Sequence, residues 1–192
     1  WLLLSAYKFY PYIRKMMPFL KKAAPMFEGK SSRVILPSAP WCFGDYSQMS
    51  SFHRNPGEGD REAEEFEEFI SLYSKLTNGH GSGADSLFRA ELAHYRGDLD
   101  MSEIFIHKAI FLAESNQQSI VQLGANLHLC EIAVERCDSE LWDKAFNSME
   151  HAATFQSNAV IRTVLDIVRG LLLNEIGHQA QIADFMKNAD QA

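Results

Sequence analysis

Two stretches of sequence decide the fold, Ala90–Asp98 (AELAHYRGD) and Cys130–Asp138 (CEIAVERCD), and they lie forty residues apart. Both place small residues, an arginine and an aspartate at matching positions. A further forty residues brings Gly170 and Gly177 to the positions of the first small residue and of the turn residue. Because no strand signal and no proline follow Gly83, this recurrence predicts a repeating unit built from helices.

Each repeated stretch is followed by a segment whose apolar or small residues recur at a 4/7 spacing, as they do on one face of a helix. Small side chains let antiparallel helices approach closely, and larger ones fill the space between pairs. We therefore predict an all-α protein, an α-solenoid of antiparallel helix pairs similar to tetratricopeptide repeats, whose period is about 34 residues. A simple helical bundle is the alternative, but recurrence of the Gly or Cys turn at 97, 137 and 177 argues against it. The spaced sets are Ser102, Ile106 and Ala109; Ala145, Met149 and Ala152; and Ile182, Met186 and Ala189.

Charge and proline divide the chain unevenly. Residues 1–50 hold seven Lys or Arg against two acidic residues, together with five of the six prolines. Short helices broken by proline are expected there. We predict a Pro-rich, basic helical junction over residues 1–56, next to a preceding unit, and a TPR-like repeat array over residues 57–192. The repeat units are predicted near residues 84–115, 119–155 and 158–190.

An amphipathic helix is expected at the start of the array. Asp60 follows a turn cluster and is predicted to be its N-cap, with glutamates in the first turn favouring the positive end of the helix dipole. The helix should end near Gly79, which suits a left-handed cap. Its buried aromatic stripe is predicted to consist of Phe66, Phe69, Ile70, Tyr73 and Leu76.

Composition bounds the class of protein. The chain is 46% hydrophobic and 22% charged, as ordinary globular domains are, and its net charge of -7 disfavours direct nucleic-acid binding. The apolar start ends at Lys8, far short of a membrane span. Three cysteines without a CxxC pair suit a reducing cytoplasm. Cys130 and Cys137 are expected on one face of a helix, packed as small apolar residues.

The motifs that could carry chemistry are weak. The stretch Gly79–Ala84 (GHGSGA) lacks the lysine of a phosphate-binding loop, so its glycines predict a sharp turn. His128 with Glu131, and Glu103 with His107, could each supply two metal ligands, but the sequence provides no third ligand. No nucleophile stands beside a base. We therefore expect no catalytic residue, no metal and no enzyme.

Ligand-contacting residues are expected on the inner groove, which the first helix of each pair lines in tetratricopeptide-like arrays. Mixed polar groups with an aromatic ring suit a small polar ligand or a peptide. A solvated helix face is the alternative interpretation. The groove candidates are Arg89, Glu91, His94, Tyr95, Asn126, Glu131, Asp166 and Arg169.

Several motifs together resemble one family. They are residues 39–47 (APWCFGDYS), 52–57 (FHRNPG), 73–84 (YSKLTNGHGSGA), 89–98 (RAELAHYRGD) and 117–120 (QQSI). They look like the linker and helical-repeat portion of large LuxR-type transcriptional regulators of the MalT-like, signal-transducing ATPase kind. The resemblance covers roughly residues 35–190.

That resemblance implies a parent protein with an N-terminal ATPase, a central helical-repeat region and a C-terminal helix-turn-helix. This chain, which begins at Trp1, is then expected to be a fragment, the central sensor module. It would bind a small-molecule inducer or a protein or peptide, with self-association as a further outcome. ATP is expected only in the parent's ATPase, so no cofactor is expected here. A stand-alone TPR-like adaptor, which binds a peptide of a partner protein, is the alternative.

Overall fold

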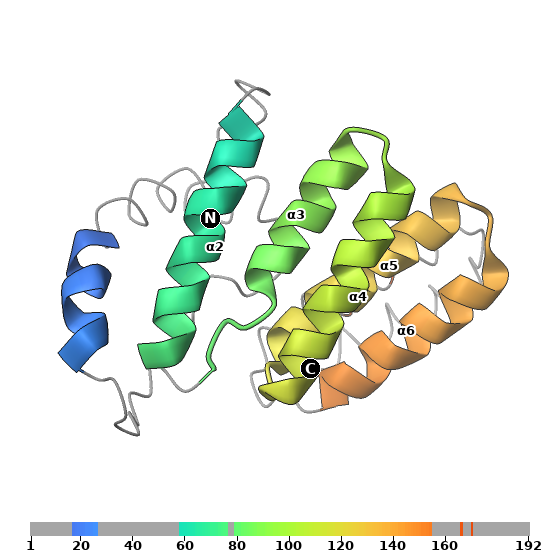
Figure 1. Ribbon diagram of the computed structural model, residues 1–192. Helices are drawn as coiled ribbons and strands as arrows, with labels where there is room; N and C mark the ends of the chain where they lie inside the picture. Colours follow the sequence, from blue (N-terminus) through green and yellow to red (C-terminus); the bar gives the residue numbers. More distant parts are fainter. Residues whose placement is uncertain (1–16, 27–57, 77–78, 155–165, 167–169, 171–192) are drawn as a thin grey trace. The chain divides into compact units, whose positions relative to one another are not determined.

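In the computed structural model, residues 17–26, 58–76, 79–154, 166 and 170 are described, and no strand occurs among them (Figure 1). The prediction of an all-α protein is therefore confirmed for this part of the chain. Residues 17–26 form one helix, and residues 166 and 170 are helical. The other helices are α2 (Gly59–Leu76), α3 (Ala84–Tyr95), α4 (Leu99–Ser115), α5 (Ser119–Glu135) and α6 (Ser139–Thr154).

The chain divides into two compact units, Trp1–Ala125 and Asn126–Ala192, so that the boundary falls within α5. The predicted junction boundary at residues 56–57 lies outside the described residues and stays a prediction. So does almost all of the third predicted repeat unit, residues 158–190.

Helix α2 buries four of the five residues of its predicted stripe; the fifth, Leu76 at the C-terminal end of the helix, is only partly buried. Phe66, Phe69, Ile70 and Tyr73 are all buried, because residues three and four apart share one side of a helix. The prediction for Asp60 was wrong: α2 begins one residue earlier, so Asp60 lies in its first turn. Its carboxylate accepts two hydrogen bonds from the Arg96 guanidinium, which follows α3.

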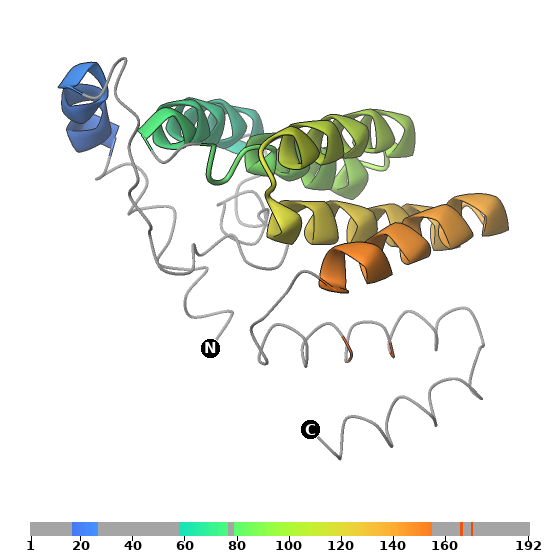
Figure 2. The same ribbon diagram turned by 90° about the horizontal axis from the view of Figure 1, so that it is seen from below.

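Helices α2, α3 and α4 are neighbours in the first unit (Figures 1 and 2). The ring of Phe66 on α2 meets that of Phe88 on α3 edge to face, with centroids 5.6 Å apart. On α4 the predicted set of Ser102, Ile106 and Ala109 is fully buried, and the Ser102 hydroxyl donates to the backbone oxygen of Ala90 on α3 at 2.9 Å. Small residues thus do hold α3 and α4 close together.

The glycine-rich segment between α2 and α3 is a tight turn, as predicted. Gly79, Gly81 and Gly83 all have positive φ, which glycine adopts without strain. The Gly81 backbone N–H donates to Gln118 Oε1 at 3.0 Å, which fixes the turn against the start of α5. At Gly83 a Cβ would lie 2.5 Å from the backbone oxygen of Ala109, so the close approach of α4 also requires glycine there.

One turn geometry links α3 to α4, α4 to α5 and α5 to α6. The residue with positive φ is Gly97, Gln117 or Cys137, at twenty-residue intervals. In each turn its N–H donates to the carbonyl three residues back, and the next N–H donates to the carbonyl five residues back, at 2.7–3.1 Å. This pattern is the Schellman motif. The forty-residue repeat of the sequence therefore contains two turns of the same kind.

Two aspartates begin the helices after the repeated stretches. Asp98 Oδ1 accepts from the Met101 N–H and Asp138 Oδ1 from the Leu141 N–H, each at 3.0 Å. Such N-caps satisfy donors that a helix start leaves open. The expectation that Cys137 shares a helix face with Cys130 was wrong, because Cys137 lies exposed in the turn, whereas Cys130 is buried in α5.

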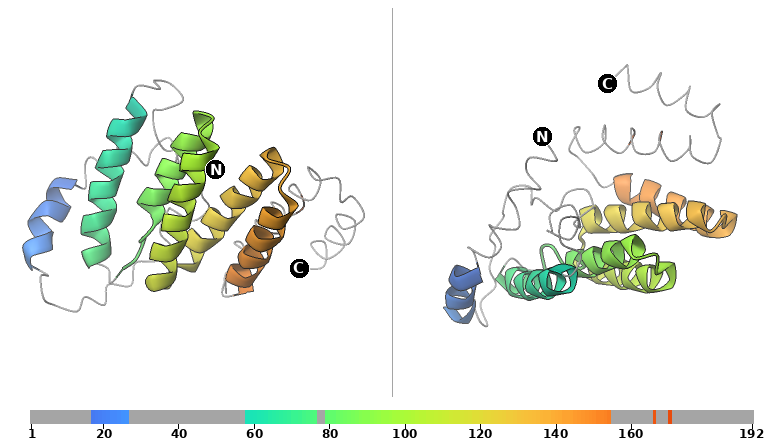
Figure 3. Two further views of the ribbon diagram at one scale, coloured as in Figure 1. Left: turned by 45° about the vertical axis from the view of Figure 1, so that its right-hand side comes forward. Right: turned by 90° about the horizontal axis from the view of Figure 1, so that it is seen from above.

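In the second unit, α6 runs back from the turn that ends α5 (Figure 3). The predicted set Ala145, Met149 and Ala152 is buried. On a neighbouring face of α6, the rings of Trp142 and Phe146 stack one helical turn apart, with centroids separated by 5.3 Å. The 4/7 spacing therefore identified the buried face of this helix as well.

Candidate functional site

The predicted groove residues belong to both units. Arg89, Glu91, His94 and Tyr95 lie on α3 in the first unit. Asn126 and Glu131 lie on α5, and Asp166 lies further along the chain, in the second unit. Arg169 lies outside the described residues.

Two of the four residues on α3 are engaged within the protein. The Arg89 guanidinium donates to Glu67 Oε2 on α2 at 2.7 Å and is mostly covered. Glu91 is only 2% exposed. The side chain of Glu91 is thus part of the interior rather than of an open face. A buried carboxylate needs partners within the protein, because desolvation disfavours its charge.

The other two residues on α3 lie next to each other at its C-terminal end. The imidazole of His94 and the phenol ring of Tyr95 stack with centroids 6.4 Å apart. Tyr95 is 51% exposed, and His94 is half-buried. An exposed ring beside an imidazole offers both a flat apolar surface and hydrogen-bonding groups to a ligand.

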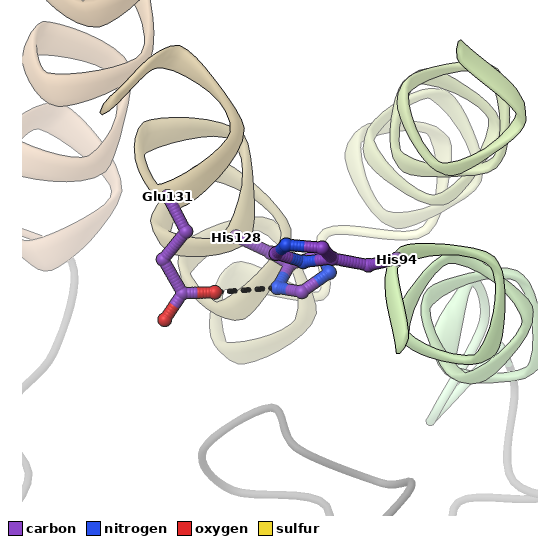
Figure 4. Close-up of side chains that lie close together, drawn as sticks. All are labelled: His94, His128 and Glu131. Atoms are coloured by element: carbon purple, nitrogen blue, oxygen red, sulfur yellow. Dashed lines mark hydrogen bonds and ion pairs between the residues drawn. The ribbon is translucent and has the colours of Figure 1, made fainter. Parts of the chain in front are cut away.

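Helix α5 carries a hydrogen-bonded histidine–glutamate pair, and its glutamate is also one of the groove candidates. His128 Nδ1 and Glu131 Oε2 lie 2.7 Å apart, one turn along the helix; Figure 4 draws this bond and also shows His94 of α3. His128 is largely covered, and Glu131 is open to solvent on one side. The carboxylate holds the imidazole in one orientation, so the other ring nitrogen has a fixed direction.

The rest of the second unit adds one buried amide. Asn126 is buried in α5, and Asp166 is partly exposed in a helical segment. Because Asn126 is buried, its side chain does not lie on an exposed groove surface as predicted. Its amide belongs to the interior, where it contributes polar specificity only through internal partners.

Burial shifts the pKa values of several titratable groups, among them His80, Asp85 and Cys130. Burial lowers the pKa of His80 in the glycine-rich turn, opposed by a hydrogen bond with Gln118. Burial also raises the pKa of Asp85 in the first turn of α3. At Cys130, burial and the nearby Glu131 raise the pKa to about 12, so this thiol stays protonated and unreactive near neutral pH.

Comparison of the chain with protein families, with curated proteins and with solved structures finds no match. Within the described part of the chain, no helix has both the length and the apolar character that crossing a membrane requires.

Proposed function

We propose that this chain is the sensor and coupling module of a LuxR-type transcriptional regulator, in which a TPR-like α-solenoid controls attached ATPase and DNA-binding domains. The observation that supports a repeat array is the Schellman turn at Gly97, Gln117 and Cys137, which keeps the same hydrogen bonds every twenty residues. Repeats of this kind present extended binding surfaces, because equivalent helix faces recur along the array.

The exposed polar side chains support a small polar inducer or a peptide as the ligand. Tyr95 offers an accessible ring beside His94, and Glu131 offers a carboxylate already paired with His128. A ligand regulates only when it binds the active arrangement of the array better than the resting one. In this proposal, inducer binding favours the arrangement that releases the ATPase for self-association, in the cytoplasm.

The alternative is a stand-alone TPR-like adaptor that binds a peptide of a partner protein. The exposure of large apolar side chains on α4 favours this second function, because such groups typically mark protein interaction sites. The two functions share a helical-repeat surface and differ in the domains joined to it.

The coding sequence on both sides of the segment distinguishes these functions. An upstream phosphate-binding loop with its lysine and a downstream helix-turn-helix would support the regulator. A start codon near Trp1 together with a stop codon after Ala192 would overturn it and favour the adaptor.

Expression of a reporter gene that the parent protein controls then tests the candidate residues. Tyr95→Ala and Glu131→Gln should each reduce induction, whereas Lys144→Gln, an exposed change on α6, should not. Unchanged induction in both variants would exclude these side chains from ligand recognition.

A further inference from the structure

The side of α4 that faces away from its buried residues carries an unusual apolar row. Met101 is 41%, Ile104 58% and Phe111 67% exposed. The buried residues of the helix, among them Ile106 and Ala109, lie on the opposite side. We call this row, completed by the exposed residues Lys108 and Ser115, the α4 seam.

The residues of the α4 seam follow one another at alternating steps of three and four. In a coiled coil, residues spaced alternately three and four apart, most of them apolar, form the line of contact between the helices. The average period of that line is 3.5 residues. Lys108 lies between Ile104 and Phe111, and a polar residue within the contact line of such a pair favours one register and one partner. The spacing thus indicates a second helix lying along α4.

Charge beside the α4 seam disfavours a second copy of the same helix as the partner. Asp100 and Glu114 flank the seam on one side, at equivalent positions two heptads apart. In an antiparallel pair of two α4 helices, Asp100 of each copy would lie opposite Glu114 of the other copy. In a parallel pair, Lys108 would face Lys108. Both arrangements place like charges together, which costs stability.

We infer that the α4 seam binds an amphipathic helix of a partner protein, with an apolar seam of its own, an acidic residue opposite Lys108 and basic residues opposite Asp100 and Glu114. A partner helix of about 17 residues, or about 25 Å, would match the length of α4. The same carboxylates repel an anionic lipid surface. The inference rests on the adaptor alternative, whose partner peptide it specifies, and is independent of the candidate groove residues, because none of them lies on α4.

Synthetic helices test the inference on the full 192-residue chain. The first peptide has leucines along its seam, a glutamate placed to face Lys108, and lysine flanks. The second is identical except for glutamate flanks. Binding is measured by fluorescence anisotropy at low and at physiological salt. We expect the lysine-flanked peptide to bind about tenfold or more tightly than its glutamate-flanked counterpart, with the difference shrinking as salt rises.

Variants of the chain locate the binding. Ile104→Ala with Phe111→Ala should weaken the lysine-flanked peptide about tenfold or more, and these exposed changes should leave the helical circular dichroism spectrum unchanged. Phe19→Ala removes an equally exposed ring, 74% accessible, outside the seam, and should have no effect. Asp100→Asn with Glu114→Gln should remove the preference between the two peptides.

Three results would overturn the inference. They are failure of the lysine-flanked peptide to bind, equal binding of both peptides to the unaltered chain, and sedimentation as a dimer that Ile104→Glu dissociates. The last would assign the seam to a second copy. None of these results bears on His94, Tyr95 or Glu131, so the proposed regulator function would stand or fall separately.

Discussion

Arg96 and Asp60 form a bidentate ion pair, with their two hydrogen bonds at 2.8 and 3.0 Å, and this pair is in register with a second one. Seven residues on from Asp60 along α2 lies Glu67, and seven residues back from Arg96 along α3 lies Arg89. Those two are joined at 2.7 Å. Seven residues are two helical turns, so both pairs lie along one line between antiparallel helices. Both pairs are compatible with the same register of α2 against α3, in which Phe66 also meets Phe88.

The Arg96–Asp60 pair should contribute a small, salt-dependent stabilisation. The hydrogen bonds from Arg96 hold the pKa of Asp60 below its usual value, but both side chains are exposed. A double-mutant cycle of Asp60→Asn and Arg96→Gln, followed by urea unfolding, should give a coupling of about 0.5 kcal/mol. Because the folded pKa is lowered, this coupling is present above pH 3.8 and is lost as the pH falls through the folded value. A coupling that persisted in about 1 M salt would contradict a solvent-screened pair.

The buried helix faces could be predicted from the sequence because they depend on local periodicity alone. Phe66 and Tyr73 on α2, and Ile106 and Met149 on later helices, are buried where their spacing predicts. A buried face at 3.6-residue spacing is visible in any window of the chain.

The interaction partners of the polar residues could not be predicted from local periodicity. The glutamate that Arg89 reaches lies 22 positions earlier, and whether the two meet depends on the register of α2 against α3. The same register takes Asp60 away from the capping role that its local sequence suggests. Gln117 was missed for another reason, because glutamine is no turn signal, and its positive φ follows from the Schellman bonds around it.

Two glycine substitutions should separate backbone strain from steric overlap. Gly97 has a φ of +78° and nothing within 4 Å of a Cβ, so Gly97→Ala should cost only the strain of about 1 kcal/mol. At Gly83, φ is +94° and the Cβ would meet the Ala109 oxygen at 2.5 Å. Gly83→Ala should therefore cost more, about 3 kcal/mol. Urea unfolding measures the loss of unfolding free energy in each variant. Equal losses would show that contact with α4 adds no steric cost at Gly83.

Cys137 should be replaceable by glycine with a gain in stability. It occupies the position that Gly97 occupies one repeat earlier, at a φ of 54°, and its side chain is exposed. Cys137→Gly should raise the free energy of unfolding by about 0.5–1 kcal/mol, and Cys137→Ala should leave it nearly unchanged. A loss of stability in the glycine variant would mean that the thiol makes a stabilising contact.

The buried hydroxyl of Ser102 should stabilise the contact between α3 and α4. It donates to the Ala90 oxygen at 2.9 Å. Ser102→Ala should lower the free energy of unfolding by about 1 kcal/mol, because the Ala90 oxygen loses a side-chain donor in the interior. The matched control is Ser148→Ala on the exposed face of α6, where a change within about 0.5 kcal/mol is expected. Similar effects at both serines would rule out a specific contribution from the bond to Ala90.

His80 should make stability fall at mildly acidic pH. Burial in the glycine-rich turn lowers its pKa below the ordinary 6.5, so the folded protein disfavours the imidazolium. Below pH 6.5 the unfolded chain takes up a proton that the folded chain does not, and stability declines as the pH falls towards the folded pKa. His80→Gln should flatten the dependence of urea unfolding on pH between about pH 5 and pH 7.5, whereas His107→Gln, on the exposed side of α4, should keep the slope of the unaltered chain. If both variants kept that slope, the acid sensitivity would lie with a group other than His80.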